Sequence, residues 1–318
     1  MKKLLREGST DFKPAKNKVK TLLFLILLSC EGFSQIPING FCKYQSFAVD
    51  SGFQKFLPLN YNDDFYTDLF FYNPFDDNIV SLDGGQNATF GKKAVKRLQE
   101  ALTDVQYLWD KNNKIYAYAF ISRKQSSAGI LKFNLDGIPE VESAIKFNTY
   151  PGHLCTGDVN GDGISELLIS GSAFNGLSLI YQEDKPREDK ISENTSYSEA
   201  EFADLNADGS PDIAAFNIFS NNLQFLYNNS KGKFSKVREI PFSYPINSIK
   251  TTDLNLDSYP DLMYSLDKTI GILYGDFKSS YEDTVILHTK YNIEKFITGD
   301  FNRDGKIDIA YINKTWLL

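Results

Sequence analysis

The sequence is poor in the residues that bind soft metals or build disulfide scaffolds. It has only three cysteines, two histidines and two methionines, and it contains no Cys-x-x-Cys pair. Three scattered cysteines (Cys30, Cys42 and Cys155) exclude a disulfide framework, and the missing ligand pairs exclude a zinc module. We expect Cys42 and Cys155 to be buried thiols that are not bonded to each other. His153 and His288 are expected to lie at strand ends or to face solvent, without a catalytic role.

Positive charge is also outnumbered by negative charge once the first twenty residues are passed. The formal net charge is −7, and no basic cluster follows that segment. A nucleic-acid-binding protein needs lysines and arginines to neutralise phosphates, so DNA and RNA are not expected partners. Aromatic residues are abundant instead, with 25 Phe and 18 Tyr. This composition favours β-strands over helices.

The sequence has no apolar run long enough for a transmembrane helix. Residues 1–20 carry seven Lys or Arg against two acids, and the apolar run 21–30 follows directly. Ten residues cannot span the ~30 Å hydrocarbon core as a helix, so the pattern predicts an export signal at 1–34. The run to Cys30 resembles a lipobox, in which Cys30 would be lipidated. Gly32–Ser34 resembles a cleavage site that would leave Gln35 first. Both endings remain open.

Export leads to expectations about location. We expect either a secreted protein or a cell-surface or outer-membrane lipoprotein of a Gram-negative bacterium. A membrane would be contacted only through the possible lipid at Cys30. Removal of 1–34 takes away seven positive and three negative side chains, which moves the net charge from −7 to −11. This acidic excess indicates that some of the carboxylates have a specific role in the protein.

One nine-residue motif recurs along the rest of the chain. Four clear copies read DVNGDGISE, DLNADGSPD, DLNLDSYPD and DFNRDGKID, starting at residues 158, 204, 253 and 300. An eroded copy, NYNDDFYTD, starts at residue 60. A sixth copy, starting at residue 110, keeps only DKNNK. Successive starts are 46 to 50 residues apart. Such a fixed period indicates a repeat architecture, in which each unit is one supersecondary element.

Strand patterns surround each motif. An alternating segment precedes it, and an apolar strand such as ELLIS or DIAAFN follows it. Two further strand patterns complete most units, the last being clearest in KVREIPF and DTVILHT. Four strands per unit of about 47 residues are typical of an all-β propeller blade. The interval predicts six blades of four strands in one domain, 35–318; seven blades is the alternative. The last unit has only three strand patterns, and we expect 41–49 to add its outer strand and close the ring.

The motif has the residue types and spacing of a calcium loop. Calcium takes oxygen ligands, and a tight loop supplies them from alternating positions. Positions 1, 3, 5 and 9 carry three carboxylates and one amide, and position 6 permits a sharp turn. Magnesium is the second choice because it needs stricter octahedral geometry. The predicted ligands are Asp158, Asn160, Asp162, Glu166; Asp204, Asn206, Asp208, Asp212; Asp253, Asn255, Asp257, Asp261; and Asp300, Asn302, Asp304, Asp308.

The other two copies are weaker. Asn60 and Asn62 stand beside Asp64 and Asp68, so that loop has less negative charge. In the copy from Asp110, a lysine occupies position 5, which predicts a plain tight hairpin. An EF-hand is excluded because position 12 is never Glu and the flanks alternate with period two. Asp257 is followed by Ser258 in place of glycine, a milder defect because serine tolerates most turn geometries except the left-handed one.

The DxNxDGxxD motif, followed by a strand every 45 to 50 residues in an exported chain, resembles the FG-GAP/VCBS repeats of integrin-α-like β-propellers. The resemblance covers about residues 50–318. It implies that each loop joins the first two strands of a blade and binds calcium. It also implies a non-enzymatic adhesion or binding module for protein or glycan ligands.

The alternative is a polysaccharide lyase or hydrolase, because propellers can host paired carboxylates at a channel mouth. No GxSxG or HExxH motif is present. If Asp136, Glu140 and Glu142 converged in a cleft with Arg or His, the enzyme would be favoured. If they were scattered over loops, binding would be favoured.

Overall fold

The computed structural model describes residues 52–86, 89–112, 114–183, 185–278 and 280–313. Described residues 300–305 belong to one compact unit, and all the others belong to a second, larger unit. Every element is a β-strand, in line with the aromatic-rich, methionine-poor composition. Among the described residues, no helix is long and apolar enough to cross a membrane.

The larger unit contains five four-stranded antiparallel sheets. The first has β1 (Lys55–Leu59), β2 (Asp68–Tyr72), β3 (Asn78–Gly85) and β4 (Thr89–Arg97), and the second has β5 (Asp104–Trp109), β6 (Ile115–Ser122), β7 (Ser127–Phe133) and β8 (Pro139–Lys146). The third has β9 (His153–Gly157), β10 (Glu166–Ser170), β11 (Leu177–Tyr181) and β12 (Arg187–Ser192). The fourth has β13 (Tyr197–Ala203), β14 (Asp212–Asn217), β15 (Asn222–Asn228) and β16 (Phe234–Pro241). The fifth has β17 (Ser248–Thr252), β18 (Asp261–Leu266), β19 (Thr269–Leu273) and β20 (Thr284–His288).

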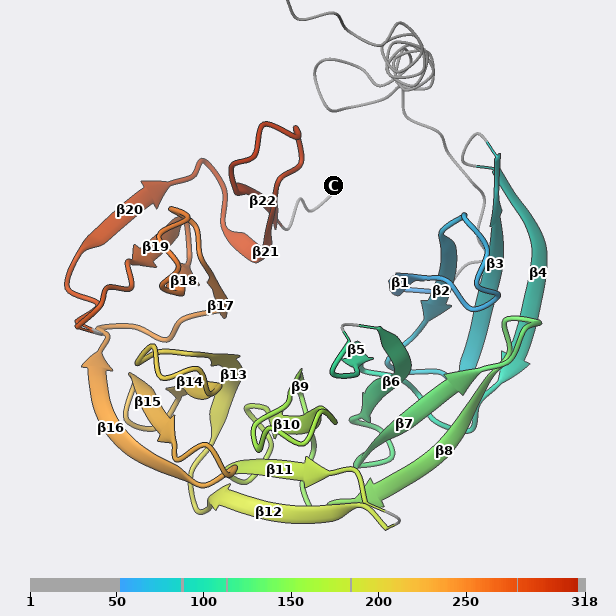
Figure 1. Cartoon of the computed structure of the whole chain (residues 1–318), viewed down its shortest axis with the longest axis horizontal. Helices are drawn as coiled ribbons and strands as arrows, with labels where there is room; N and C mark the ends of the chain where they lie inside the picture. The colour runs from blue at the N-terminus through green and yellow to red at the C-terminus, as the bar shows by residue number, and fades with distance from the viewer. Residues whose placement is uncertain (1–51, 87–88, 113, 184, 279, 314–318) are drawn as a thin grey trace, which may run out of the picture. The chain divides into compact units, whose positions relative to one another are not determined.

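Each sheet is a simple meander in which consecutive strands pair. Figure 1 shows the first strand of each sheet innermost and the fourth strand outermost. The innermost strands of successive sheets contact one another from β5 to β9, β13 and β17. This is the blade arrangement predicted from the repeat, and the fold is an all-β propeller.

The hydrophobic core lies between neighbouring sheets. The middle strands β10 and β14 are buried along their whole length, because a sheet packs against each of their faces. The outer strand β8 instead alternates between buried or half-buried and exposed positions. One core cluster joins Leu108 of the second sheet to Leu154 and Leu167 of the third. Stacking of the blades therefore buries apolar faces that a single blade would leave exposed.

The sixth repeat unit has two described strands, β21 (Ile293–Gly299) and β22 (Asp308–Asn313), which pair antiparallel. The third strand expected in this unit is not found among the described residues. The predicted closing segment 41–49 and residues 314–318 lie outside them, as does the predicted signal at 1–34. Six blades, closure by 41–49 and the domain limits 35–318 therefore stay predictions.

The core of the fourth sheet gives a test with a matched control. Phe216 on β14 is fully buried and packs edge-on against Phe242, whereas Phe219 is 72% exposed. We expect Phe216→Ala to lower the free energy of unfolding by about 3–5 kcal/mol because it leaves a cavity. Phe219→Ala should change it by less than about 0.5 kcal/mol. Urea unfolding of both variants measures the difference, and equal effects would contradict the assigned core.

Candidate metal-binding loops and buried charged cluster

The predicted loops lie between the first and second strands of their sheets, where the repeat places them. Their backbones share an unusual turn. Position 4 has a positive φ in Gly161, Ala207, Leu256 and Arg303, and position 6 has one in Gly163, Gly209, Ser258 and Gly305. Ser258 adopts a φ of 74°, so the serine is held in the left-handed conformation that it was expected to avoid. The loop shape is therefore kept even where glycine is absent.

The loop from Asp204 shows how the side chains are held. The Asp204 carboxylate accepts backbone N–H groups from Asp208 and Gly209 at 3.0 and 2.9 Å. Asn206 Oδ1 accepts the N–H of Asp208 at 2.9 Å, and Asp208 Oδ1 accepts that of Ser210. The side chains of positions 1, 3 and 5 are thus turned into the loop by its own backbone, as the spacing predicts.

The loop from Asp253 repeats these contacts at the same positions. The loop from Asp158 repeats them with one difference, because Asp158 Oδ1 accepts the N–H of Gly161 in place of that of Asp162. Among the described residues, none of the nine carboxylates in these three loops pairs with a lysine or arginine. The negative charge is therefore left uncompensated. Burial first, and then the charges of Asp162 and Asp158, raise the pKa of Glu166 to about 7. Burial and the charges of Asp208 and Asp204 raise the pKa of Asp212 to about 6.

A donor set made only of carboxylate and amide oxygens fits a hard divalent cation such as calcium. Each loop would bring three carboxylates to the ion, so the net local charge would fall to about −1. Softer metals prefer histidine or cysteine, and neither occurs in these motifs. The predicted ligands at positions 1, 3 and 5 are therefore placed in a way that suits calcium.

The acid at position 9 has an additional role. Asp212 is fully buried, and its two oxygens accept the N–H of Leu205 at 3.0 Å and of Asn228 at 2.7 Å. It thereby joins the start of the loop to the third strand of the sheet. Asp68 and Asp261 are equally buried and make the corresponding pair of bonds. Glu166, which is one methylene longer, bonds the N–H of Val159 at 3.0 Å.

The fourth clear loop is seen through residues 300–305. Asp300 accepts the N–H groups of Asp304 and Gly305 at 3.0 and 2.9 Å, and Asn302 Oδ1 accepts that of Asp304. This matches the loop from Asp204. Asp308, the predicted ligand at position 9, is the first residue of β22 and pairs with Gly299.

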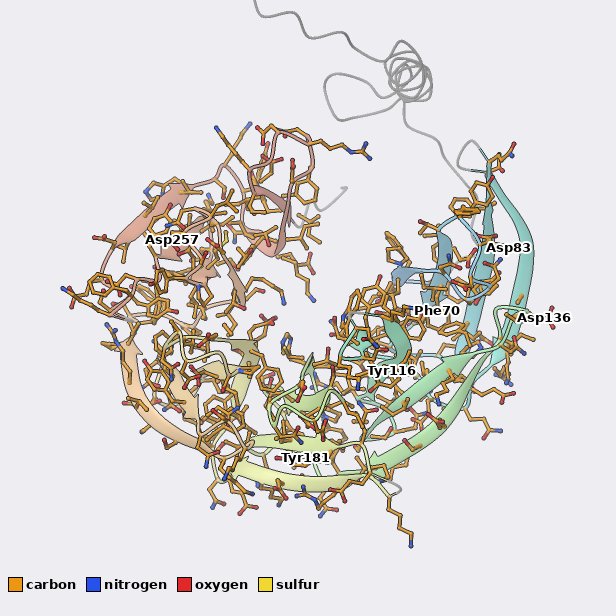
Figure 2. The ribbon with its side chains drawn as sticks, viewed as in Figure 1. Phe70, Asp83, Tyr116, Asp136, Tyr181 and Asp257 are labelled. Carbon is orange, nitrogen blue, oxygen red and sulfur yellow. The ribbon has the colours of Figure 1, made fainter. Side chains whose placement is uncertain are left out.

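The eroded loop from Asn60 contains an acid that the motif does not reveal. Asp83 on β3 accepts the side-chain N–H of Asn62 at 2.9 Å and the hydroxyl of Tyr61 at 3.0 Å. Asn60 itself donates to the backbone carbonyl of Asp64. The copy therefore brings a carboxylate from a later strand to the loop. Asp83 lies outside the nine-residue window, so only the fold brings it here (Figure 2).

The copy from Asp110 is a short turn, as predicted. The Asp110 N–H donates to the Lys114 carbonyl at 2.9 Å, and Asp110 Oδ1 accepts the N–H groups of Asn112 and Lys114. Strand β6 begins at Ile115, so the full loop is missing. This turn does not provide the ligand set of the other copies.

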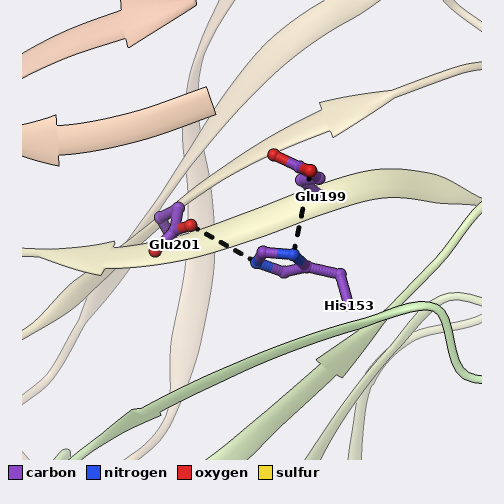
Figure 3. A group of neighbouring side chains, drawn as sticks. All are labelled: His153, Glu199 and Glu201. Carbon is purple, nitrogen blue, oxygen red and sulfur yellow. Dashed lines mark ion pairs between the residues drawn. The ribbon is translucent and has the colours of Figure 1, made fainter. Parts of the chain in front are cut away.

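A second group of charged side chains lies on the innermost strands (Figure 3). His153 of β9 has Nδ1 3.9 Å from Glu199 Oε1 and Nε2 3.4 Å from Glu201 Oε1, both on β13. The Nε2 atom is buried and makes no well-directed hydrogen bond. Lys250 of β17 pairs with Glu201, and Glu199 accepts the Ser248 hydroxyl at 2.9 Å. Three sheets thus meet through buried charges.

The pKa values of this buried charged cluster are coupled. Burial of the ring would lower the pKa of His153, but the nearby Glu201 and Glu199 outweigh burial and raise it. Burial would likewise raise the pKa of Glu201, but Lys250 and His153 lower it to about 2. His153 begins strand β9, so it lies at a strand end as expected, but its ring is almost fully covered and does not face solvent. The exposed strand β20 ends at His288, which does face solvent. Cys155, a free thiol, is half-buried beside Glu201.

The acids considered for an enzyme do not converge in this way. Asp136 lies in the turn between β7 and β8, and Figure 2 shows it at the outer edge of the sheets. Glu140 lies 3.8 Å from Lys96, and Glu142 lies 2.5 Å from Lys132. Neither Glu140 nor Glu142 meets a histidine or arginine in an ion pair among the described residues.

Comparison with known proteins supports the sequence interpretation. Residues 204–264 match the FG-GAP-like repeat family. A lectin of Agrocybe aegerita that recognises non-reducing terminal N-acetylglucosamine is similar in structure, with a TM-score of 0.52 and 14% identity over 81% of this chain and 71% of its own. BBS1N in complex with ARL6DN is also similar, with TM-scores of 0.51 and 0.55 in two structures. Both structures show 10% identity, over 84% and 83% of this chain and 94% and 90% of theirs. No curated protein matches the sequence. Residues 204–264 are thus similar to an FG-GAP-like repeat, and the fold is a β-propeller, as the resemblance implied.

Local hydrogen exchange tests the role assigned to position 9. In the presence of a chelator, Asp212→Ala should raise the exchange rates of the Leu205 and Asn228 amides by about tenfold or more, because each loses a buried acceptor. Asp208→Ala should instead affect the amide of Ser210. Amide exchange by NMR, referenced to amides of the second sheet, distinguishes the two variants. Protection of Leu205 and Asn228 that survives in Asp212→Ala would contradict the role.

The buried charged cluster predicts a pH dependence. The raised pKa of His153 means that its stabilising contribution is fully present below about pH 6.5, its unfolded value, and is lost as the pH rises through the folded value. The difference in melting temperature between the wild type and His153→Gln should therefore shrink as the pH rises from 6 to 9. Thermal melts in excess calcium measure this difference. A difference that stays constant or grows would contradict the ion-paired imidazolium.

Proposed function

We propose that this protein is an exported, non-enzymatic propeller whose bound calcium stiffens the blades and whose loops bind a protein or glycan. The observation that carries the calcium part is the set of nine carboxylates in three loops that have no lysine or arginine partner within the described part of the chain. Such groups repel one another within a small loop, and a divalent cation removes most of that repulsion. Export rests on the sequence of residues 1–34, including the possible lipid at Cys30.

The expected contribution of calcium is large. Extracellular calcium modules have dissociation constants near 10⁻⁴ to 10⁻³ M, so ~2 mM calcium stabilises each site by roughly 0.7 to 1.8 kcal/mol. Four independent sites would contribute about 3 to 7 kcal/mol, which is comparable with the stability of a typical domain. At these magnitudes the ion has a structural role, and a separate surface must bind the partner.

A binding role is supported by two kinds of observation. The similar structures include a glycan-binding lectin and a protein bound to a protein partner. The carboxylates that an enzyme would need are occupied elsewhere: Glu140 and Glu142 face lysines. Glu199 and Glu201 are mostly buried against His153, so they are poorly placed to meet a polysaccharide. Nucleic acid does not suit a chain with this acidic excess.

Calcium-dependent melting tests the proposal. We expect the melting temperature of residues 35–318 to fall markedly when a chelator replaces 2 mM calcium. The Asp204→Ala, Asp208→Ala variant should lose the part of the calcium-induced increase that belongs to one site, about 0.7 to 1.8 kcal/mol.

The matched control is Glu140→Ala, Glu142→Ala, which removes the same charge from the outer strand β8. It should keep the full calcium-induced increase. The variants are compared by the increase in melting temperature that calcium causes. A loss of stability from missing loop hydrogen bonds is present with and without calcium, so it cancels in this increase. A melting temperature that is the same in calcium and in chelator would sink the proposal.

A further inference from the structure

The second repeat differs from the others at the residue before its loop. That position holds an apolar or small residue elsewhere, namely Leu59, Gly157, Ala203, Thr252 and Gly299, but here it holds a tryptophan, Trp109. The same repeat has lost its metal loop and makes the short turn from Asp110 to Lys114. A large aromatic side chain therefore stands where the copies with the full loop have a small residue.

A hollow of about 530 Å³ lies between this turn and the intact loop of the third repeat. Trp109, Asp110 and Lys111 line one side, and residues 156–158 with Gly163 and Ser165 line the other. A Cβ atom on Gly163 would come within 3.0 Å of the Lys111 side chain, so a larger residue there would crowd this wall. The volume falls in the usual range of small-ligand pockets, roughly 300–1,000 Å³.

The walls of the hollow are fixed to each other. The Ser165 hydroxyl donates to the Trp109 carbonyl at 3.2 Å, and the Thr156 hydroxyl donates to the Tyr107 carbonyl at 3.0 Å. An isolated antiparallel bridge joins Asp110 to Ile164. The Trp109 ring also packs against Tyr107, with ring centroids 5.9 Å apart. The site is thus preorganised, which lowers the entropy cost of binding.

Binding groups in the hollow are free to meet a ligand. Trp109 is 43% exposed, and neither its indole N–H nor the Lys111 ammonium has a partner among the described residues. Asp110 uses Oδ1 for the N–H groups of its own turn, which leaves Oδ2 with only a long contact of 3.4 Å to Asn112. The hollow therefore offers an aromatic face, two donors and a carboxylate acceptor.

We propose that this hollow is a saccharide-binding site, with a sugar ring stacked on Trp109 and its hydroxyl groups bonded to Asp110 and Lys111. A pyranose has one face of C–H groups that can cover an indole, and a rim of hydroxyls that both donate and accept hydrogen bonds. A phosphate or other multiply charged anion fits less well, because Asp110 and Asp158 both line the hollow. The assignment rests on the proposed binding function and names its ligand class and its site.

Fluorine NMR provides a direct test. The chain has two tryptophans, Trp109 and Trp316, so 5-fluorotryptophan labelling should give two resonances, and Trp109→Phe identifies one of them. The probes are methyl glycosides of glucose, galactose, mannose, N-acetylglucosamine, fucose and xylose, added to the calcium-loaded protein up to 50 mM. At least one glycoside should shift the Trp109 resonance with saturation and leave that of Trp316 unchanged.

Two variants test the contacts. Trp109→Ala should raise the dissociation constant of the glycoside that binds by about tenfold or more, because the stacking surface is lost. Saturation-transfer NMR measures this constant. Asp110→Asn keeps the Oδ1 acceptor of the turn but replaces Oδ2 with a donor, and it should weaken binding by about tenfold. Tyr244→Ala, at an exposed aromatic in the connection between β16 and β17, should bind as the wild type does.

The outcomes separate this site from the general function. If no glycoside shifts Trp109, or if a glycoside binds equally well to Trp109→Ala, the saccharide site is refuted. Trp109 is not a predicted calcium ligand, so Trp109→Ala should keep the full calcium-induced rise in melting temperature. A missing rise in the wild type would overturn the calcium-stabilised module instead, whatever the glycosides do.

Discussion

The fold depends on one contact that recurs through the repeats, the buried carboxylate at position 9 of the motif. In Asp68, Asp212 and Asp261 it accepts one N–H from the loop and one from the third strand or the segment just after it, at distances of 2.7 to 3.0 Å. A buried acceptor that serves two buried donors is costly to lose, because both N–H groups would be left without water or partner. The loop is therefore attached to the sheet by hydrogen bonds that do not require an ion. The same carboxylate also raises the electrostatic cost of the metal-free loop, since burial opposes its ionisation. The acid that fixes the geometry is thus also one that benefits from a cation.

Sequence predicts the features that the repeat period controls. The apolar run after each motif predicts a strand, and β10, β14 and β18 begin at the predicted acids Glu166, Asp212 and Asp261. The short turn at Asp110 also followed from a local feature, the lysine at position 5. The conformation of Ser258 did not, because the propensity of one residue is weaker than the constraint of the loop bonds around it. Local rules succeed where the neighbouring residues determine the structure.

Contacts between repeats could not be predicted in the same way. His153, Glu201 and Lys250 are far apart in sequence, and none belongs to a motif. They meet because each lies on the innermost strand of its own sheet, and the three sheets are neighbours. Asp83 likewise reaches the loop from Asn60 only through the pairing of β2 with β3. A pattern search within one repeat has no access to such residues. A propeller model can identify them, because it shows which strand of each blade lies next to which strand of the neighbouring blade.

Departures from the repeat are informative for the same reason. Where the loop is intact, the position before it is a small residue, Gly157, Ala203, Thr252 or Gly299, and the carboxylates turn inward. Where the loop is lost, a tryptophan appears at that position, and the adjacent intact loop supplies the opposite wall of a hollow. A repeat that lacks the full loop can vary there without losing its sheet, because β5 to β8 still pair in order. The blade then keeps its structural role through strand pairing and core burial, while the exposed turn becomes available for recognition. Stability and binding can in this way be carried by different copies of one motif.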